Sequence, residues 1–239
     1  MRRWLGSIAF TTILFVSVAV YGLVVLALGI FGYRSTYAGC RLWARMILGL
    51  LRVLCGLDFS VRGLERLPDE NGIILMKHSS SWETIAQLVL FPRQTWVMKR
   101  ELIWAPILGW VIFLLKPIPI DRKGGRTAVE QVIRVGRQRL EQGFWVVIFP
   151  EGTRVPAGQT GRFGMSGVLL ARAAGRPIVP VAHNAGYYWP RRGLLKRSGT
   201  IQVVVGEPIP TAERDPREVN AEVKAWIETE IAAMAKPAV

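Results

Sequence analysis

The chain has 239 residues, of which 51% are hydrophobic and 20% are charged. That length is enough for one domain with a core of its own, and the composition excludes an intrinsically disordered chain. The excess of 31 Lys and Arg over 17 Asp and Glu gives a net charge of +14, which indicates an anionic partner. Cys40 and Cys55 lie far from either histidine, so neither a metal site nor a disulfide framework is expected.

The N-terminal segment is predicted to be a membrane anchor over residues 1–33. No charged residue occurs between Trp4 and Tyr33, and a bilayer-spanning helix needs about 20 apolar residues. A signal peptide would have a shorter apolar region of roughly 7–15 residues and a small-residue cleavage site. Because arginines flank both ends of the run, a single span and a hairpin that returns to the same side both remain open.

Residues 34–56 are predicted to form a basic amphipathic helix. Arg41, Arg45 and Arg52 are spaced by four and seven residues, so they share one helix face. Directly after an anchor, such a helix is typical of a membrane interface; the alternative is a core helix with a solvated arginine edge. The excess of arginine here places the rest of the chain on the cytoplasmic face of a membrane, with a bacterial inner membrane expected.

From residue 57 onward, short apolar runs alternate with amphipathic ones. This pattern predicts one α/β domain over residues 57–239, with a sheet sandwiched by helices. Predicted strands cover residues 57–61, 72–77, 95–98, 117–120, 144–149, 178–182 and 201–205. Predicted helices cover residues 82–91, 127–142 and 165–174, followed by a last helix capped by Asp215. A capping box of Thr127 and Glu130 is expected to open the helix at 127–142.

A histidine and a carboxylate follow the buried strand that ends near residue 76. His78 lies just beyond the strand, and Glu83 lies five positions later in the first turn of the next helix. A carboxylate on one ring nitrogen leaves the other nitrogen basic, as a general base requires. The alternative is structural, because Ser80 and Glu83 by themselves form a helix-capping box.

Basic residues occur at the ends of three other predicted strands. These are Lys99, Arg122 and Arg154, the last in the run Phe149-Pro-Glu-Gly-Thr-Arg154. Fixed cations and free backbone N–H groups at the mouth of a sheet bind phosphate. Each cation alone fits a solvated loop, but three of them beside a His–carboxylate pair indicate a phosphate site.

Five blocks in this order resemble the 1-acylglycerol-3-phosphate acyltransferase family, also called lysophosphatidic acid acyltransferases, within the glycerolipid acyltransferase group. The family pattern is His-x4-Asp, Lys-x-Glu-Leu, Ile-Asp-Arg, Phe-Pro-Glu-Gly-Thr-Arg and Val-Pro-Val. The departure is Glu83 in place of Asp; its extra methylene still lets it reach the imidazole, although acceptor preference could differ. The matching blocks, within roughly residues 57–206, are His78-x4-Glu83, Lys99-Arg-Glu-Leu102, Ile120-Asp-Arg122, Phe149-Pro-Glu-Gly-Thr-Arg154 and Val179-Pro-Val181.

The resemblance implies a mixed β-sheet flanked by helices, as in glycerol-3-phosphate acyltransferases, and a membrane enzyme of phospholipid synthesis. It implies that His78 is the general base on the free hydroxyl of lysophosphatidic acid, and that Glu83 orients His78. The implied product is phosphatidic acid, and the implied donor is acyl-CoA or acyl-carrier protein, with no metal or other cofactor. The implied phosphate-binding residues are Lys99, Arg122 and Arg154, and the implied loop-shaping residues are Glu151, Gly152 and Thr153.

Several alternatives remain open at this point. The acceptor could be another lysolipid such as lyso-ornithine lipid, or glycerol 3-phosphate, and a non-catalytic membrane lipid-binding protein could keep the same fold. A nucleic-acid partner is not expected, because no long Lys/Arg run or recognised nucleic-acid motif is present. His183 is expected to be structural.

Overall fold

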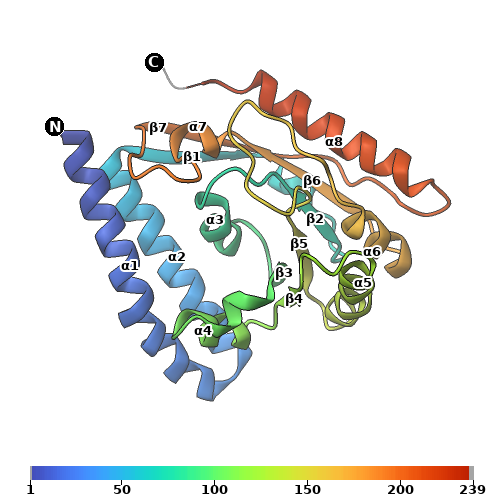
Figure 1. The fold of residues 1–239 in the computed structure, drawn as a ribbon, viewed down its shortest axis with the longest axis horizontal. Coiled ribbons are helices and arrows are strands. Elements are labelled where there is room, and N and C mark those ends of the chain that lie inside the picture. The colour runs from blue at the N-terminus through green and yellow to red at the C-terminus, as the bar shows by residue number, and fades with distance from the viewer. Residues whose placement is uncertain (1, 237–239) are drawn as a thin grey trace.

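The uncharged N-terminal run forms a long helix, as its apolar character predicts. In the computed structural model, which describes residues 2–236, α1 (Arg2–Leu28) leads through a 3-10 turn (Gly29–Phe31) into α2 (Tyr33–Cys55). The two helices lie side by side as a hairpin (Figure 1). Gly32 makes the reversal at a φ of 90°, a conformation that favours glycine.

A seven-stranded mixed sheet follows, which confirms the predicted fold class. Its strand order is β1-β7-β6-β2-β5-β3-β4, and every neighbouring pair is parallel except β6 and β7. The strands β2, β3, β4, β5 and β6 therefore end at the same edge of the sheet. The strand bounds are β1 Leu57–Arg62, β2 Ile73–Met76, β3 Gln94–Lys99, β4 Ile118–Ile120, β5 Trp145–Ile148, β6 Ile178–His183 and β7 Gly199–Val205.

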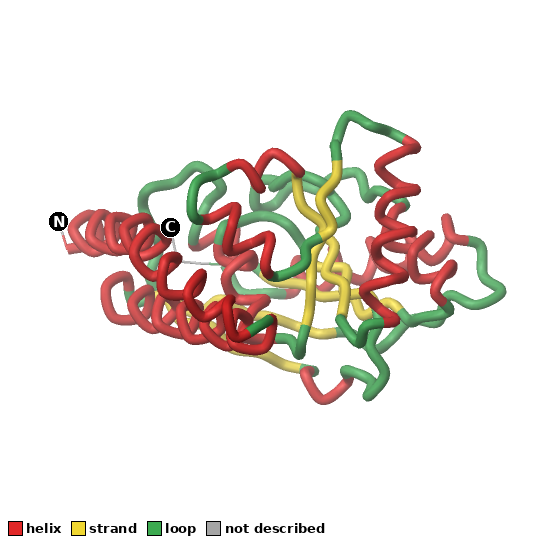
Figure 2. The backbone as a smooth tube through the Cα atoms, turned by 90° about the horizontal axis from the view of Figure 1, so that it is seen from below, coloured by secondary structure: helices red, strands yellow, loops and turns green. Residues whose placement is uncertain are grey.

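Helices cover both faces of this sheet (Figures 1 and 2). Successive strand residues point to opposite faces: Ile74 packs in the core under α2 and α3, whereas Ile73 packs in the core under α6 and α8. Burial on both faces explains why the central strands are continuous apolar runs. The helices beyond α2 are α3 Trp82–Leu90, α4 Leu108–Leu114, α5 Arg126–Glu141, α6 Ser166–Ala174, α7 Ala185–Tyr188 and α8 Pro216–Ala233, with 3-10 turns at Leu64–Arg66 and Arg100–Trp104.

The apolar side of α2 is buried against α1, α3 and β1, while Arg45 and Arg52 lie on its exposed side. The exposed side also carries the apolar residues Leu42, Met46 and Val53, so it mixes arginines with apolar side chains. Contact of that exposed side with a membrane, and the division of the chain at residues 33 and 56, stay predictions.

A capping residue was predicted at the starts of α5 and α8, and only the prediction for α8 is confirmed. At α8 the carboxylate of Asp215 accepts a hydrogen bond from the backbone N–H of Arg217, as expected of an N-cap. The capping box of Thr127 and Glu130 is wrong. Two glycines let α5 begin one residue earlier, at Arg126, so Thr127 lies inside the first turn, and Glu130 pairs with Arg126 at 2.8 Å instead of capping.

Candidate active site

The carboxyl ends of the five parallel strands bring the predicted site residues to one edge of the sheet. His78 follows β2, Lys99 ends β3, Arg122 follows β4, Arg154 lies in the loop after β5, and His183 ends β6. In α/β sheets this edge is where ligands bind.

His78 and Glu83 form a buried pair. The Nδ1 atom of His78 lies 2.9 Å from Oε1 of Glu83, and the carboxylate is fully buried. The same oxygen accepts the backbone N–H groups of Ser79 and Ser80 at 2.9 and 2.8 Å. One carboxylate therefore binds two backbone N–H groups of the turn that leads into α3 and also holds the imidazole. Of the predicted capping box only the contact from Glu83 to Ser80 forms, because the N-cap residue of α3 is Ser81 and it makes no side-chain cap.

The surroundings of Glu83 keep it ionised. Burial alone raises the pKa of Glu83, but the hydrogen bonds from His78 and from the backbone N–H of Ser80 hold that pKa below its ordinary value. In the neutral form of His78, an ionised acceptor at Oε1 favours the tautomer with its proton on Nδ1, in which Nε2 carries the lone pair. No hydrogen bond to Nε2 occurs within residues 2–236.

His183 lies behind this pair. Its Nε2 is 2.8 Å from the carbonyl oxygen of Lys77 and 3.9 Å from Oε2 of Glu83, and its Nδ1 accepts the N–H of Ala185. Burial lowers the pKa of His183, which keeps the ring neutral. With both ring nitrogens occupied, His183 has no nitrogen free to act as a base.

A second buried pair, which sequence patterns did not indicate, joins two of the loops. Nζ of Lys77 lies 2.9 Å from Oε1 of Glu151, and both side chains are almost fully buried. Oε2 of Glu151 accepts the backbone N–H of His78 at 3.2 Å. The loop after β5 is therefore tied to the strand end that carries His78, a contact consistent with the bracing role implied for Glu151. Gly152, at a φ of 64°, turns this loop.

A cavity of about 510 Å³ opens beside His78, within the usual size range of small-molecule sites. Thr153 and the three predicted cations Lys99, Arg122 and Arg154 all line it. Its remaining walls are largely apolar and come from α1, α2, α3, β3 and α4. They include Val18, Val25, Leu88, Leu108, Val111 and Ile112.

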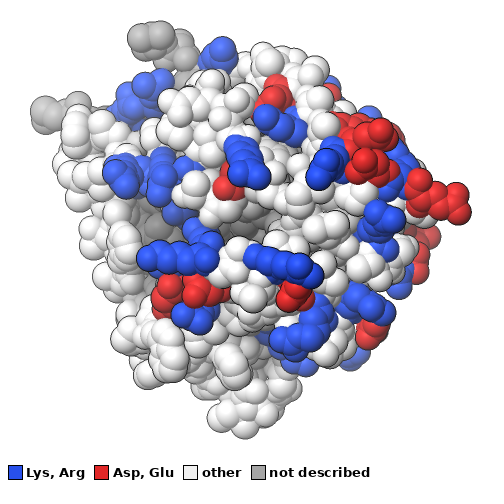
Figure 3. All heavy atoms as spheres, turned by 45° about the vertical axis from the view of Figure 1, so that its right-hand side comes forward, with Lys and Arg blue, Asp and Glu red and all other residues white. Residues whose placement is uncertain are grey.

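Two of the cations at this cavity, Arg154 and Arg191, are held by contacts with backbone carbonyl groups. Nε of Arg154 donates to the carbonyl oxygen of Ser80 at 2.6 Å, and the carbonyl oxygen of Arg154 accepts from Arg191 at 3.1 Å. Sequence patterns did not single out Arg191, which also lines the cavity; its only signal is the Arg-Arg dipeptide at 191–192. Figure 3 shows Lys and Arg side chains gathered around a hollow on one face of the molecule.

The arrangement joins a histidine whose Nε2 has no hydrogen-bond partner among the described residues to a cavity lined by cations and by apolar side chains. Such a site can take a proton from a hydroxyl of an amphiphile with an anionic head group. Within residues 2–236, no group of three or more His, Cys, Asp or Glu side chains is placed to hold a metal ion.

Comparisons with known proteins agree with this chemistry. Residues 58–184 match the family model described as Acyltransferase. The 1-acyl-sn-glycerol-3-phosphate acyltransferase of Pseudomonas aeruginosa is 46% identical over 188 residues, which are 77% of this chain and 73% of that protein. The human 1-acyl-sn-glycerol-3-phosphate acyltransferase alpha is 31% identical over 83% of this chain and 71% of its own.

A solved structure shares the fold. The crystal structure of the 1-acyl-sn-glycerophosphate (LPA) acyltransferase PlsC from Thermotoga maritima superposes with a TM-score of 0.81. The superposition covers 99% of this chain and 98% of that one, at 22% sequence identity.

Proposed function

We propose that this chain, which belongs to the acyltransferase family, moves a fatty acyl group from an acyl thioester to the free hydroxyl of 1-acyl-glycerol 3-phosphate. The product is phosphatidic acid. One observation carries this proposal: His78, whose Nδ1 contacts Glu83, lines the same cavity as Arg122 and Arg154. The named relatives act on the same acceptor.

In the proposed reaction, Nε2 of His78 takes the proton of the acceptor hydroxyl as the hydroxyl oxygen attacks the thioester carbonyl carbon. The ester C–O bond forms, the C–S bond breaks, and the proton passes from His78 to the departing thiolate. Glu83 stabilises the imidazolium that forms between these two steps. The transfer is direct, so no acyl-enzyme is expected.

The cavity has a cationic part for the phosphate of the acceptor and an apolar part for its acyl chain. Lys99, Arg122 and Arg154 bind its phosphate, and the position of Arg154 is set by its bond to the Ser80 carbonyl. The apolar walls from α1, α2, α3, β3 and α4 take an acyl chain. Acyl-CoA and acyl-carrier protein are both anionic donors that suit a chain with a net charge of +14.

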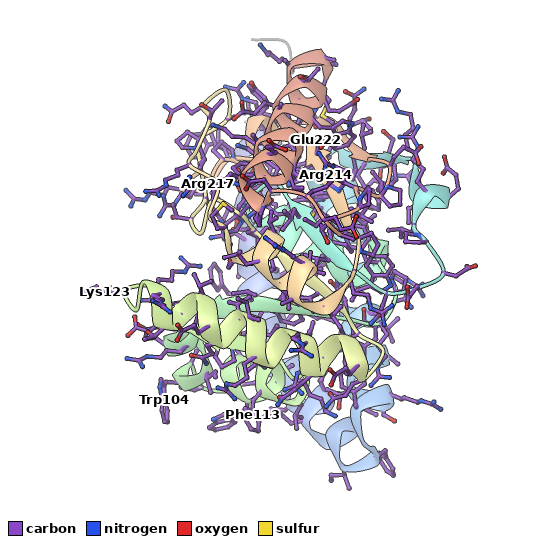
Figure 4. All side chains as sticks on the ribbon, turned by 90° about the vertical axis from the view of Figure 1, so that its right-hand side faces the viewer. Trp104, Phe113, Lys123, Arg214, Arg217 and Glu222 are labelled. Atoms are coloured by element: carbon purple, nitrogen blue, oxygen red, sulfur yellow. The ribbon has the colours of Figure 1, made fainter. Side chains whose placement is uncertain are left out.

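The enzyme is further proposed to work at a membrane, with its catalytic domain on the cytoplasmic face. The stretch Arg3–Phe31 is long and apolar enough to cross a bilayer and is mostly unburied. Trp104, at the end of the 3-10 turn before α4, and Phe113, in α4, are 82% and 64% exposed and project outward (Figure 4). Figures 1 and 3 place α4 and the turn between α1 and α2 at an end of the molecule with little charge.

The contacts of α1 favour insertion into one side of the membrane over a span. Near its start, Nε of Arg3 donates to the carbonyl oxygen of Lys196, and just beyond its end Gly29 packs against Leu114. A helix held to the domain at both ends cannot cross a bilayer without taking the domain with it. The exposed apolar face of α1 then lies in the membrane beside Trp104 and Phe113.

The test is acyl transfer by the membrane-bound protein from labelled acyl-CoA and from acyl-carrier protein, with His78→Ala as the matched variant. Lysophosphatidic acid should be acylated, and the variant should lose at least about 10²-fold in rate. Acylation of lyso-ornithine lipid alone would keep the base mechanism and overturn the phosphate assignment. Acylation of neither acceptor would favour a lipid-binding protein.

A further inference from the structure

We propose that Arg191 is a further acceptor-binding residue, which completes a cradle of three guanidinium groups with Arg122 and Arg154 around the phosphate. This inference rests on the proposed function and extends it to a loop outside the five sequence blocks, since the last of those blocks ends at Val181.

The position of Arg191 places it on the wall of the active-site cavity. It belongs to the loop between α7 and β7, and it lines the cavity together with His78 and Arg154. Its Nη1 donates to the carbonyl oxygen of Arg154 at 3.1 Å, so the two residues adjoin on that wall. A guanidinium has five N–H donors, and this bond leaves most of them available to a ligand.

The three guanidiniums lack the carboxylate partners that nearby cations have. Lys99 pairs with Glu101 at 3.4 Å, and Arg100 pairs with Asp121 at 3.1 Å. Among residues 2–236, no carboxylate lies within salt-bridge distance of Arg122, Arg154 or Arg191.

The charges of this group act on one another. Burial lowers the pKa of Arg122, and the charge of Arg154 lowers it further; the charge of Glu101 acts in the opposite direction, and that of Arg191 again lowers the pKa. A phosphate monoester carries about −1.5 to −2 charges at neutral pH, so its binding would relieve this repulsion. A lysolipid without a phosphate monoester would bring less negative charge to the three guanidinium groups.

The loop that carries Arg191 is fixed to α1. The Trp189 ring packs edge-on against Phe10, with centroids 5.3 Å apart. Lys196 is buried, and its backbone N–H donates to Oγ of Ser7 at 3.0 Å. A side chain presented from a fixed frame loses less freedom when it binds a ligand. Helix α1 therefore contacts the loop that carries Arg191 and also supplies apolar residues to the cavity wall.

The experiment compares Arg191→Ala with Arg192→Ala. Arg192 is the matched control, because it is exposed, adjacent in sequence and absent from the cavity lining. For Arg191→Ala the KM for lysophosphatidic acid should rise about 10- to 100-fold, the usual effect of losing a hydrogen bond to a charged group. The KM for the acyl donor should stay unchanged, Arg191→Lys should recover part of the loss, and Arg192→Ala should match the unaltered enzyme.

A binding measurement separates this inference from the proposed function. The dissociation constant of lysophosphatidic acid is measured in the His78→Ala background, with and without Arg191→Ala, after thermal unfolding shows that both variants fold. Weaker binding only with Arg191→Ala supports the inference. If the unaltered enzyme acylates lysophosphatidic acid and Arg191→Ala behaves like Arg192→Ala, or raises only the donor KM, the role of Arg191 is overturned and the proposed function stands. If the unaltered enzyme neither binds nor acylates lysophosphatidic acid, the proposed function and the cradle both fail.

Discussion

His78 and His183 lie at the ends of neighbouring parallel strands and on either side of the same carboxylate, yet their chemistry differs. His78 uses Nδ1 to contact Glu83, and the residue lines the cavity. His183 has both nitrogens occupied, by the Lys77 carbonyl and the Ala185 N–H. What separates a candidate base from a structural histidine here is an unoccupied nitrogen beside a cavity, and not the residue type or its place after a strand.

The largest expected effect distinguishes the two histidines directly. His78→Ala should lower kcat by about 10²- to 10⁴-fold, because it removes the general base. His183→Gln should change kcat far less, because its amide nitrogen can replace Nε2 as the donor to Lys77. Steady-state rates with saturating acceptor test this, and equal losses in both variants would contradict the assignment of His78.

The second-largest effect on kcat is expected from substitution of Glu83, the carboxylate that lies between the two histidines. Glu83→Gln removes the charge that stabilises the imidazolium, and the loss of a charge-assisted hydrogen bond costs about 1.5–3 kcal/mol, or about 10- to 100-fold in kcat. Glu83→Asp keeps the charge and matches the family pattern, so it should retain more activity. Full activity of Glu83→Gln would show that the pair has only the capping role.

A stability difference is expected at His183. His183→Asn cannot place a donor where Nε2 lies, so the buried Lys77 carbonyl loses its partner at a cost of about 1–3 kcal/mol. His183→Gln restores the donor and should be destabilised less. Urea unfolding of the two variants measures this, and an Asn variant as stable as the Gln variant would count against the bond between His183 and Lys77.

The smallest expected effect is a pH dependence. The pKa of His183 is lowered from 6.5 in the folded chain, so below pH 6.5 the unfolded chain takes up a proton that the folded chain does not. Stability present above pH 6.5 is therefore lost as the pH falls toward the folded pKa, by at most about 1.4 kcal/mol per pH unit. Glu83 adds a loss in the same direction only below 4.5, the value from which its pKa is lowered.

The unfolding midpoints of unaltered protein and His183→Gln should accordingly diverge between pH 7.5 and 5.5, with the variant showing the smaller loss in acid. Parallel curves would mean that His183 does not titrate differently in the folded and unfolded chains.

Local sequence patterns anticipated most of the secondary structure and the residues at the strand ends. The apolar runs predicted all seven strands, and Asp215 marked the start of the last helix. The prediction failed at Thr127, where a helix that began one residue earlier displaced the cap. It also gave no sign of α4, whose short apolar sequence does not distinguish a helix from a strand.

The site was anticipated less completely, because its remaining parts depend on contacts between distant residues. The burial of Lys77 with Glu151 depends on the pairing of β2 with β5. Arg191 lies at the cavity on a loop that packs on α1, where Trp189 contacts Phe10 from a distant part of the chain. No spacing rule within one segment detects such neighbours.

The sequence by itself determined the α/β class, the long uncharged helix and the placing of His78, Lys99, Arg122 and Arg154 at strand ends, since these follow from hydrophobic period and local order. Only the tertiary structure decided that those strand ends share one edge, that α1 forms a wall of the cavity, and that Glu83 serves both His78 and the start of α3. Strand order and burial bring together side chains that are far apart along the chain, and those contacts decide which nitrogens and charges stay free for a ligand.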